Sequence, residues 1–391
     1  MKPFPSPREL AELDVGSARA ILERLAAIPA EQSEAFEADP AVQTYLRETV
    51  VAEAEHLGLS GSHDAMGGFV VRAGSAGAHR ALLFGYAMTH PANRMADPYV
   101  PSVSAGRLRG RGVAEQKGAL AAALMATAWI HRRRSRLDGE LVLCVSAAGE
   151  TGRHDAARTF MAGHGSPPFD WAIVAIGTGN AICPTNKGRI DLTVVVRGRS
   201  AHSSTPWAGD NAITGATEAL RRLAALDLGT SHPALGSATL TPTAVESRPR
   251  ATHTIPDEVR LIVDRRLLPG DDVGSALADV RGALEGMEPF SVSVEPGPFM
   301  FPSEVAERSA VLSVLQEAFT ALTGAPAPIF HSHGSLDAGF FNVEGVPAVM
   351  LGPGEPAMWH TDEETVDLEQ VASCARIYAA AAYRQLAAGP T

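Results

Sequence analysis

Short apolar runs alternate with helical stretches at both ends of the chain. Runs typical of buried strands are bounded by glycine, proline or charged residues, and occur at 68–72, 81–88, 140–146 and 171–176. Apolar side chains at helical spacing lie before and between these runs, at 7–27, 37–57, 115–135 and 153–163. This alternation predicts an α/β domain with a mixed, largely parallel sheet.

The pattern changes near residue 187, where "RIDLTVVVRG" alternates polar and apolar residues like a half-exposed strand. The elements expected next are a helix at 208–226, strands at 237–247 and 258–267, a helix at 272–286 and a strand at 290–295. Strand, helix, strand, strand, helix, strand is the order of a ferredoxin-like α+β fold.

The first pattern returns after "EPGPFMFP", with a helix at 304–323, a strand at 346–351 and a helix at 366–387. We therefore predict a discontinuous α/β domain of residues 1–186 and 298–391. A smaller ferredoxin-like domain of residues 187–297 is inserted into it.

Composition narrows the classes of partner and compartment. The 391 residues carry a net charge of −11, which disfavours nucleic acid and anionic membranes. No apolar stretch is long enough to span a membrane, and "MKPFPSPREL" lacks the apolar core of a signal peptide. Cys144, Cys183 and Cys374 are odd in number and form no CxxC pair. We expect a cytoplasmic protein without a cysteine-based zinc site.

Four polar positions could carry chemistry, although none is specific alone. Glu115 opens a predicted helix in "GRLRGRGVAEQKGAL", where a capping acid is the simpler interpretation. Glu150 follows a buried strand, at the edge of an α/β sheet where ligands bind, and a turn carboxylate is equally compatible. His202 and His360 lie in loops, where a histidine is more often solvated than a ligand.

Taken in order, four segments resemble the zinc amidohydrolase and peptidase family of aminoacylase, acetylornithine deacetylase, succinyl-diaminopimelate desuccinylase and carboxypeptidase G. The segments are "DPYVPSVSAGRLRGRGVAEQKGALAAAL", "GRSAHSSTPWAGDNAI", "HTIPDEVRLIVDRRLLPG" and "LGPGEPAMWHTDEE". The resemblance covers nearly the whole chain. It implies the same discontinuous α/β domain, with the inserted domain serving as a lid and dimerisation domain.

The resemblance also implies a site for two zinc ions, held by five protein ligands. It assigns the first ion's own ligands to Tyr86 and Ile176, a phenol and an alkyl group that are poor or impossible zinc ligands. The bridging carboxylate falls on Glu115, and the second ion's own ligands fall on Glu150 and His360.

Two further residues differ from the family's pattern. Met88 replaces the aspartate that orients the first ion's histidine, and Gly149 replaces the glutamate that acts as general base. Such a base contributes about 10²–10⁴-fold in rate. Glu115, Glu150 and His360 form a set that holds one divalent ion at most, zinc being the preferred metal, or that binds substrate without any metal.

The substrate-binding residues are better preserved. Arg266 matches the family's arginine that binds the substrate carboxylate, with a surface ion pair as the alternative role. His253 stands where the family has an asparagine beside that arginine. His202 matches a histidine that reaches the active site from the partner subunit and stabilises the oxyanion. The resemblance therefore implies a homodimer formed through the inserted domain.

Several other polar residues lie near the expected site and could replace the missing base. They are Tyr86, His90, His154, Asp155, His331, His333 and Asp337. A tyrosine or histidine can transfer protons in a site that is poor in metal. The sequence does not distinguish among them.

Three interpretations remain open. The first is an enzyme that acts on an acyl or amide group of a small, carboxylated, amino-acid-like substrate without the two-zinc mechanism. Its catalytic groups would be Glu150, Glu115, His360, His202 and Tyr86. The absence of the base makes amide formation, cyclisation or acyl transfer in a biosynthetic pathway as compatible as hydrolysis.

The second interpretation is a non-catalytic protein that binds small molecules, and the third is a metal-dependent amidohydrolase with a rearranged site. The retained acids and histidines favour the first interpretation over the second, because a simple binding protein has little use for a solvated acidic cluster. Gly149 in place of the glutamate counts against the third.

Overall fold

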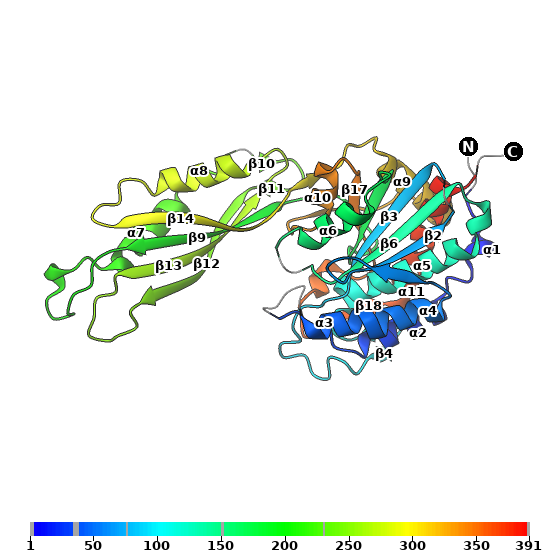
Figure 1. Ribbon diagram of the computed structural model, residues 1–391, viewed down its shortest axis with the longest axis horizontal. Coiled ribbons are helices and arrows are strands. Elements are labelled where there is room, and N and C mark those ends of the chain that lie inside the picture. The colour runs from blue at the N-terminus through cyan, green and yellow to red at the C-terminus, as the bar shows by residue number, and fades with distance from the viewer. Residues whose placement is uncertain (1–3, 34–38, 76, 150–151, 230, 389–391) are drawn as a thin grey trace. The chain divides into compact units, whose positions relative to one another are not determined.

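The computed structural model describes residues 4–33, 39–75, 77–149, 152–229 and 231–388. The chain forms two compact units (Figure 1). The larger unit comprises Met1–Thr185, Glu304–His331 and Leu336–Thr391, and the inserted unit comprises Asn186–Ser303 and Ser332–Ser335. The second boundary lies six residues later than 297/298, because strand β14 continues to Met300.

A mixed sheet forms the centre of the larger unit. Its nine strands within the described residues are, in spatial order, β1 (Gly61–His63), β2 (Phe69–Gly74), β6 (Gly139–Ser146), β3 (His79–Tyr86), β7 (Trp171–Ala175), β17 (Ala348–Leu351), β8 (Ile182–Asn186) and β15 (Ser303–Glu304), with β16 (Ile329–Ser332) paired to β8. The pairs β6–β3, β3–β7 and β7–β17 are parallel, whereas β1–β2, β2–β6 and β17–β8 are antiparallel. The prediction of a mixed, largely parallel sheet is confirmed.

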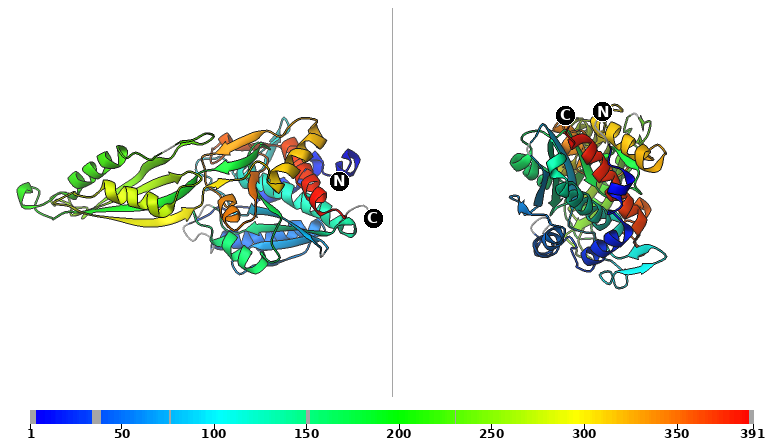
Figure 2. Two further views of the ribbon diagram at one scale, coloured as in Figure 1. Left: turned by 90° about the horizontal axis from the view of Figure 1, so that it is seen from above. Right: turned by 90° about the vertical axis from the view of Figure 1, so that its right-hand side faces the viewer.

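The parallel strands are buried on both faces, as their continuous apolar sequences require. In β3, every residue from Arg80 to Tyr86 is buried. The alanine-rich helices α5 (Gly118–Arg132) and α11 (Leu368–Leu386) lie side by side (Figure 2) and pack against β3 and β6. Helices α6 (Asp155–His164) and α10 (Ala338–Val343) contact each other, with α6 against β6 and α10 against β7 and β17.

The remaining helices of the larger unit differ in detail from the predicted ranges. They are α1 (Pro7–Leu10), α2 (Val15–Ala26), α3 (Pro40–Thr44), α4 (Val51–His56), α9 (Ala310–Thr323), the π-helical turns η2 (Tyr45–Val50) and η3 (Val113–Lys117), and the short 3₁₀ helices η4 (Arg134–Arg136) and η6 (Pro356–Met358). The helix expected from 304 begins only at Ala310, because Ser309 caps it by accepting the Leu312 N–H. A small sheet of β18 (Thr365–Asp367), β5 (Arg107–Arg109) and β4 (Ser102–Ser104) was not predicted.

The inserted unit has the predicted ferredoxin-like order. Its principal elements are β9 (Gly188–Arg197), α7 (Ala212–Ala224), β12 (Thr239–Arg248), β13 (Glu258–Leu267), α8 (Val273–Ala283) and β14 (Ser291–Met300), and a short ribbon joins β10 (Ser231–His232) to β11 (Gly236–Ser237). The four long strands form an antiparallel sheet in the order β12-β13-β9-β14. Aliphatic side chains from this sheet and from both helices form a separate core. Strand β12 lies at the edge of the sheet.

Two global expectations concern the environment of the protein. Within the described residues, no helix combines the length and apolar character needed to cross a membrane. The three cysteines, all of them described, are buried and form no disulfide. A reducing cytoplasm therefore stays a prediction.

Candidate active site

Glu115 is positioned by a buried carboxylate at the start of the turn that carries it. Glu364 accepts hydrogen bonds from the backbone N–H groups of Gly112 at 2.8 Å, Ala114 at 2.9 Å and Glu115 at 3.3 Å. It also forms an ion pair with Arg111 at 3.0 Å, and both side chains are 1% exposed. A carboxylate satisfies the unpaired N–H groups at a helix start, so Glu364 fixes η3 and with it Glu115.

Glu115 meets His360, as the sequence predicted for two members of one site. The His360 Nε2 atom lies 3.2 Å from Oε1 and 3.1 Å from Oε2 of Glu115. Glu115 is buried, whereas the His360 side chain is 40% exposed. The His90 ring stacks on His360 with their centroids 3.9 Å apart. A carboxylate next to an accessible imidazole can share a proton or bind a cation.

The third member of the expected metal set, Glu150, lies outside the described residues. Within the described part of the chain, no group of three or more His, Cys, Asp or Glu side chains could hold a metal ion. Of this set, the described residues bring Glu115 and His360 together, and the role of Glu150 stays a prediction.

Tyr86 ends strand β3 and belongs to a buried cluster of three polar side chains. Its hydroxyl donates to Asp337 Oδ2 at 2.7 Å. The other oxygen of Asp337, Oδ1, lies 2.7 Å from His154 Nδ1. Asp337 precedes α10 and His154 precedes α6, and all three residues are at most 3% exposed. We refer to Tyr86, Asp337 and His154 as the tyrosine cluster.

Gly149 lies against the ring of Tyr86. A Cβ atom at position 149 would be only 2.8 Å from Met88 Sδ and 2.8 Å from Tyr86 Cδ1. Side-chain atoms do not approach so closely, so any larger residue at 149 would displace the Tyr86 ring or the Met88 thioether. Ile176 follows β7 and is 1% exposed. These side chains supply a hydrogen-bonded phenol, a thioether and an alkyl group.

Lys117 anchors the same turn from the other side. It is fully buried, and its Nζ donates to the Ile28 carbonyl at 2.9 Å, above the rings of Tyr45 and Tyr99 at 5.1 and 5.5 Å. Burial lowers the pKa of Lys117 to about 7, against the opposing attraction of Glu364 and Glu31. Lys117 therefore contributes to the structure around Glu115 rather than to an exposed surface.

His202 and His253 lie together in the inserted unit. His202 forms an isolated bridge with Thr254, and the His202 and His253 rings are nearly parallel with centroids 6.4 Å apart. His253 precedes β13, which begins at Glu258, and His202 follows β9, whose last residue Arg197 pairs with Glu258. The two histidines are thus brought together at one end of that strand.

Within one chain, Arg266 lies at the opposite end of β13 from His253. From Glu258 to Arg266 the strand extends roughly 25 Å. The Arg266 guanidinium donates to both oxygens of Asp264 at 2.8 and 2.9 Å and to the His333 carbonyl at 3.4 Å. This geometry is that of an ion pair along a strand, and binding of a substrate carboxylate stays a prediction.

The remaining polar candidates have varied surroundings. Asp155 pairs with Arg153 at 3.6 Å, and Nδ1 of His331 is buried without a hydrogen-bond partner. Glu364 was not assigned a role from sequence, although it ends the "HTDEE" segment. The sequence feature that could have pointed to Glu364 is its position four residues after His360.

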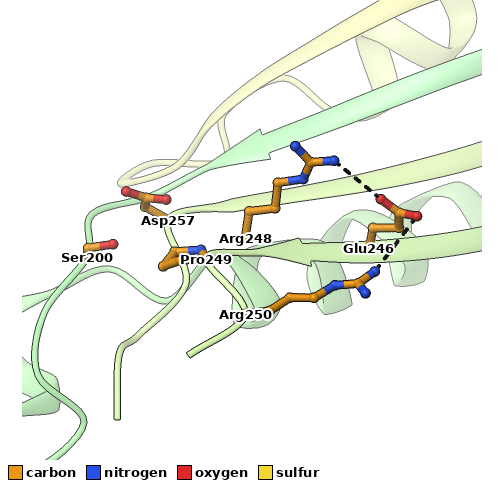
Figure 3. Close-up of a pocket in the computed structure, with 6 residues that line it drawn as sticks. All are labelled: Ser200, Glu246, Arg248, Pro249, Arg250 and Asp257. Carbon is orange, nitrogen blue, oxygen red and sulfur yellow. Dashed lines mark ion pairs between the residues drawn. The ribbon is translucent and has the colours of Figure 1, made fainter. Parts of the chain in front are cut away.

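An open pocket of about 800 Å³ lies in the inserted unit (Figure 3). Its lining residues are Ser200, Glu246, Arg248, Pro249, Arg250 and Asp257. Both arginines extend toward Glu246, each at 3.9 Å. The pocket is therefore polar and internally paired, and it contains none of the predicted site residues.

The chain belongs to peptidase family M20/M25/M40, whose model matches residues 89–384. It is 28% identical to the succinyl-diaminopimelate desuccinylase of Parvibaculum lavamentivorans over 298 residues, which are 72% of this chain and 73% of that protein. It is 29% identical to an acetylornithine deacetylase of Myxococcus xanthus over 285 residues, 71% of this chain and 72% of that one. The resemblance seen in the sequence is confirmed for the family.

Solved structures show the same fold at lower identity. An M20 family metallo-carboxypeptidase from Sulfolobus solfataricus superposes with a TM-score of 0.76 at 15% identity, covering 93% of this chain and 98% of that one. A dinuclear metal binding peptidase of the family from Bacillus subtilis gives a TM-score of 0.68 at 15% identity, covering 94% and 98%. These likenesses confirm the fold class.

Proposed function

We propose that this protein is an enzyme acting on an acyl or amide group of a small, carboxylated, amino-acid-like substrate without a two-zinc mechanism. Two relatives are named for removing succinyl and acetyl groups from amino-acid-like compounds. Membership in the family supports amide or acyl chemistry. The arrangement around Tyr86 supports a departure from the mechanism expected of a dinuclear site.

The single observation that carries this proposal is the hydrogen bond from Tyr86 to Asp337. At the position assigned to a histidine ligand, the phenol donates its proton at 2.7 Å inside the protein. Ile176 offers no donor atom, and the carboxylate expected at 149 has no room beside Tyr86 and Met88. These residues do not fit a pair of zinc ions, because the first ion would lack its own ligands.

The second metal position keeps more of its chemistry. Glu115 and His360 are in contact, and with Glu150 they are the residues that would hold one divalent ion. Such an ion would polarise a substrate carbonyl. Without an ion, the same three residues supply hydrogen bonds and proton transfer to the substrate. The proposal includes at most one ion.

The glycine at position 149 widens the range of reactions that we propose. In a hydrolase of this family, the residue at 149 would take a proton from water, and glycine cannot. A reaction in which an amine or another substrate group attacks the acyl carbon needs no dedicated water-activating carboxylate. Amide formation, cyclisation and acyl transfer are therefore included in the proposal beside hydrolysis.

The proposal includes a homodimer formed through the inserted unit. Strand β12 is an edge strand, and edge strands are surfaces for pairing with another chain. Trp207 and Val245 of this unit are 80% and 65% exposed, which is unusual for large apolar side chains. Arg266 and His202 lie at opposite ends of β13, so a small substrate can contact both only when they come from different copies.

Metal analysis combined with turnover measurements tests the proposal. Purified protein would be assayed for metal content and then given N-acetyl and N-succinyl amino acids, as well as amines with acyl donors, with and without a chelator. We expect at most one ion per chain and turnover that does not need a pair of ions. Chelator-sensitive hydrolysis with close to two zinc ions bound per chain would contradict the proposal.

A metal-dependent amidohydrolase with a rearranged site is the second candidate. The contact between Glu115 and His360 favours it, because a carboxylate beside a partly exposed imidazole resembles half of a metal site. Full loss of hydrolysis on chelation, restored only when about two equivalents of zinc are added, would support this candidate over the first.

A further inference from the structure

Asp337 accepts hydrogen bonds from two side chains that the rest of the fold brings to it. Tyr86 donates to one carboxylate oxygen and His154 lies against the other, both at 2.7 Å. The side chains of His154 and Asp337 are only 1% and 4% exposed. A carboxylate removed from water in this way needs such donors, since an unpaired buried charge is strongly destabilising.

The three residues come from three elements that converge where the central strand β3 ends. Tyr86 is the last residue of β3, His154 is the N-cap of α6 and Asp337 precedes α10. β3 is a parallel strand, and the carboxyl ends of parallel strands are where α/β proteins bind ligands. The cluster therefore lies at the carboxyl end of a parallel strand, where α/β proteins commonly bind ligands.

Aromatic side chains surround the tyrosine cluster. The Phe84 ring packs edge-on against the rings of Tyr86 and Phe341, with centroids 5.6 and 5.2 Å apart. The centroids of the Phe340 and His154 rings are 5.4 Å apart. Such an apolar surrounding strengthens the hydrogen bonds within it. A purely structural contact between these elements could be made by apolar side chains at no desolvation cost, which points to a chemical role for the polar ones.

The ring of Tyr86 fills the space in which the family's general base would begin. A side chain at Gly149 would meet Tyr86 Cδ1 and Met88 Sδ at 2.8 Å. The phenol ring thus occupies space that the first side-chain carbon of a glutamate at 149 would need. It is also bonded to a carboxylate, the same chemical group that the glutamate would have supplied.

We propose that Tyr86 conducts a proton from the attacking group of the substrate to Asp337, so that Asp337, reached through the phenol, replaces the missing base. This inference rests on the proposed function. As the nucleophile attacks the acyl carbon, its proton moves to Tyr86 Oη, and the phenolic proton moves to Asp337 Oδ2. The carbonyl π electrons move to the carbonyl oxygen. When the tetrahedral intermediate collapses, the proton returns along the same path to the leaving group.

His154 has a positioning role in this relay. Its Nδ1 must carry hydrogen to donate to Asp337 Oδ1, which fixes the ring and stabilises the negative charge on the carboxylate before transfer. Asp337 keeps its second oxygen for Tyr86. Tyr86 is the catalytic residue, and Asp337 and His154 act through it.

Three conservative variants test the relay: Tyr86→Phe, Asp337→Asn and His154→Gln. The assay uses the N-acyl amino acid, or the pair of amine and acyl donor, that the wild type converts. We expect Y86F and D337N to lower kcat about 100-fold or more, and H154Q about 10-fold, with KM nearly unchanged. Circular dichroism and thermal unfolding establish that each variant is folded.

The chain offers a matched control at the other end of the same strand. His79 begins β3, and its Nδ1 lies 3.1 Å from Asp170 Oδ2, a pairing of the same two residue types with side chains that are 33% and 32% exposed. The variants His79→Gln and Asp170→Asn should retain wild-type kcat. A similar loss in these variants would assign the effect to destabilisation and overturn the inference.

Rates in mixtures of H₂O and D₂O give a readout that a structural role would not change. Two protons move in the wild-type step, so a plot of rate against the deuterium fraction of the solvent should be curved. In D337N the second proton has no acceptor, and the plot should become linear. Wild-type turnover that survives in Y86F would overturn the relay and leave the proposed function standing. Absence of any wild-type turnover would reject the proposed function, and the relay with it.

Discussion

At the residue scale, Gly149 shows how the side chains around Tyr86 exclude one another. Restoring the family's glutamate by Gly149→Glu would force its Cβ to within 2.8 Å of Met88 and Tyr86. We expect the free energy of unfolding to fall by about 1–3 kcal/mol, as in other overpacked sites. Urea denaturation measures this change.

The control for G149E is a variant in which the obstructing side chains are also replaced. Combining it with Tyr86→Ala and Met88→Ala removes the phenol ring and the thioether, so the penalty specific to position 149 should shrink. Equal stability of G149E and the wild type would show that this region is open and would remove the steric argument.

Lys117 carries a pH dependence of its own. Its pKa is lowered by burial from 10.5 to about 7, so between these values the folded state holds a neutral amine while the unfolded state binds a proton. Stability therefore rises with pH across this range, by up to ~1.4 kcal/mol per pH unit from this group. Below pH 7 both states are charged and the full desolvation cost remains.

The variant Lys117→Met tests this sign. The variant should be more stable than the wild type by the largest margin at pH 7 and below. This difference in the free energy of unfolding should become smaller toward pH 10. Denaturation at several pH values measures the difference directly. A constant difference across this range would show that Lys117 does not change protonation on unfolding.

At the element scale, the π-helical turn η3 depends on one carboxylate. Glu364 receives three backbone N–H groups and the Arg111 guanidinium, all out of contact with water. Glu364→Gln leaves a buried arginine without its counter-charge, which should destabilise the fold by about 3–5 kcal/mol. Thermal unfolding measures the loss.

The exposed pair Arg19 and Glu23 on α2 provides the comparison for E364Q. Both side chains are accessible at this i,i+4 contact, so Glu23→Gln should cost less than about 1 kcal/mol. An equally small effect for E364Q would mean that η3 does not depend on its cap.

Element patterns predicted the fold because burial is periodic along each strand and helix. In β13, buried residues alternate with more accessible ones through the whole strand, and the order of the inserted unit followed directly. The turn η3 was not predicted, because its cap comes from Glu364, some 250 residues away in the sequence.

The sequence predicted those features of the candidate site that depend on the type of a single residue, and not those that depend on contacts between distant residues. The absence of donor atoms at Ile176 and Gly149 is visible in the sequence itself. The tyrosine cluster is not, because Asp337 lies 251 positions from Tyr86 and 183 from His154, and no local pattern records such contacts. Likewise, the sequence does not reveal that the whole of strand β13 separates His253 from Arg266 within one chain.

At the scale of the whole molecule, mixing two inactive variants tests whether copies share sites. His202→Ala removes the residue expected from the partner, and Tyr86→Phe disables the chain's own relay. In a mixed dimer, one of the two sites contains both intact residues, so reassociation of equal amounts should restore about a quarter of wild-type activity. Steady-state rates after denaturation and refolding together measure the recovery.

Refolding each variant alone is the control, and neither should recover activity. A mixture that stays inactive, although light scattering shows dimers, would place His202 in its own chain's site or outside catalysis altogether.

The ten residues of β13 thus separate Arg266 from the histidines at the other end of the strand. In an assembly of two copies, a compound that engages Arg266 and His202 together would bridge separate polypeptides. Its affinity would then report on assembly, weakening as the protein is diluted and its copies separate.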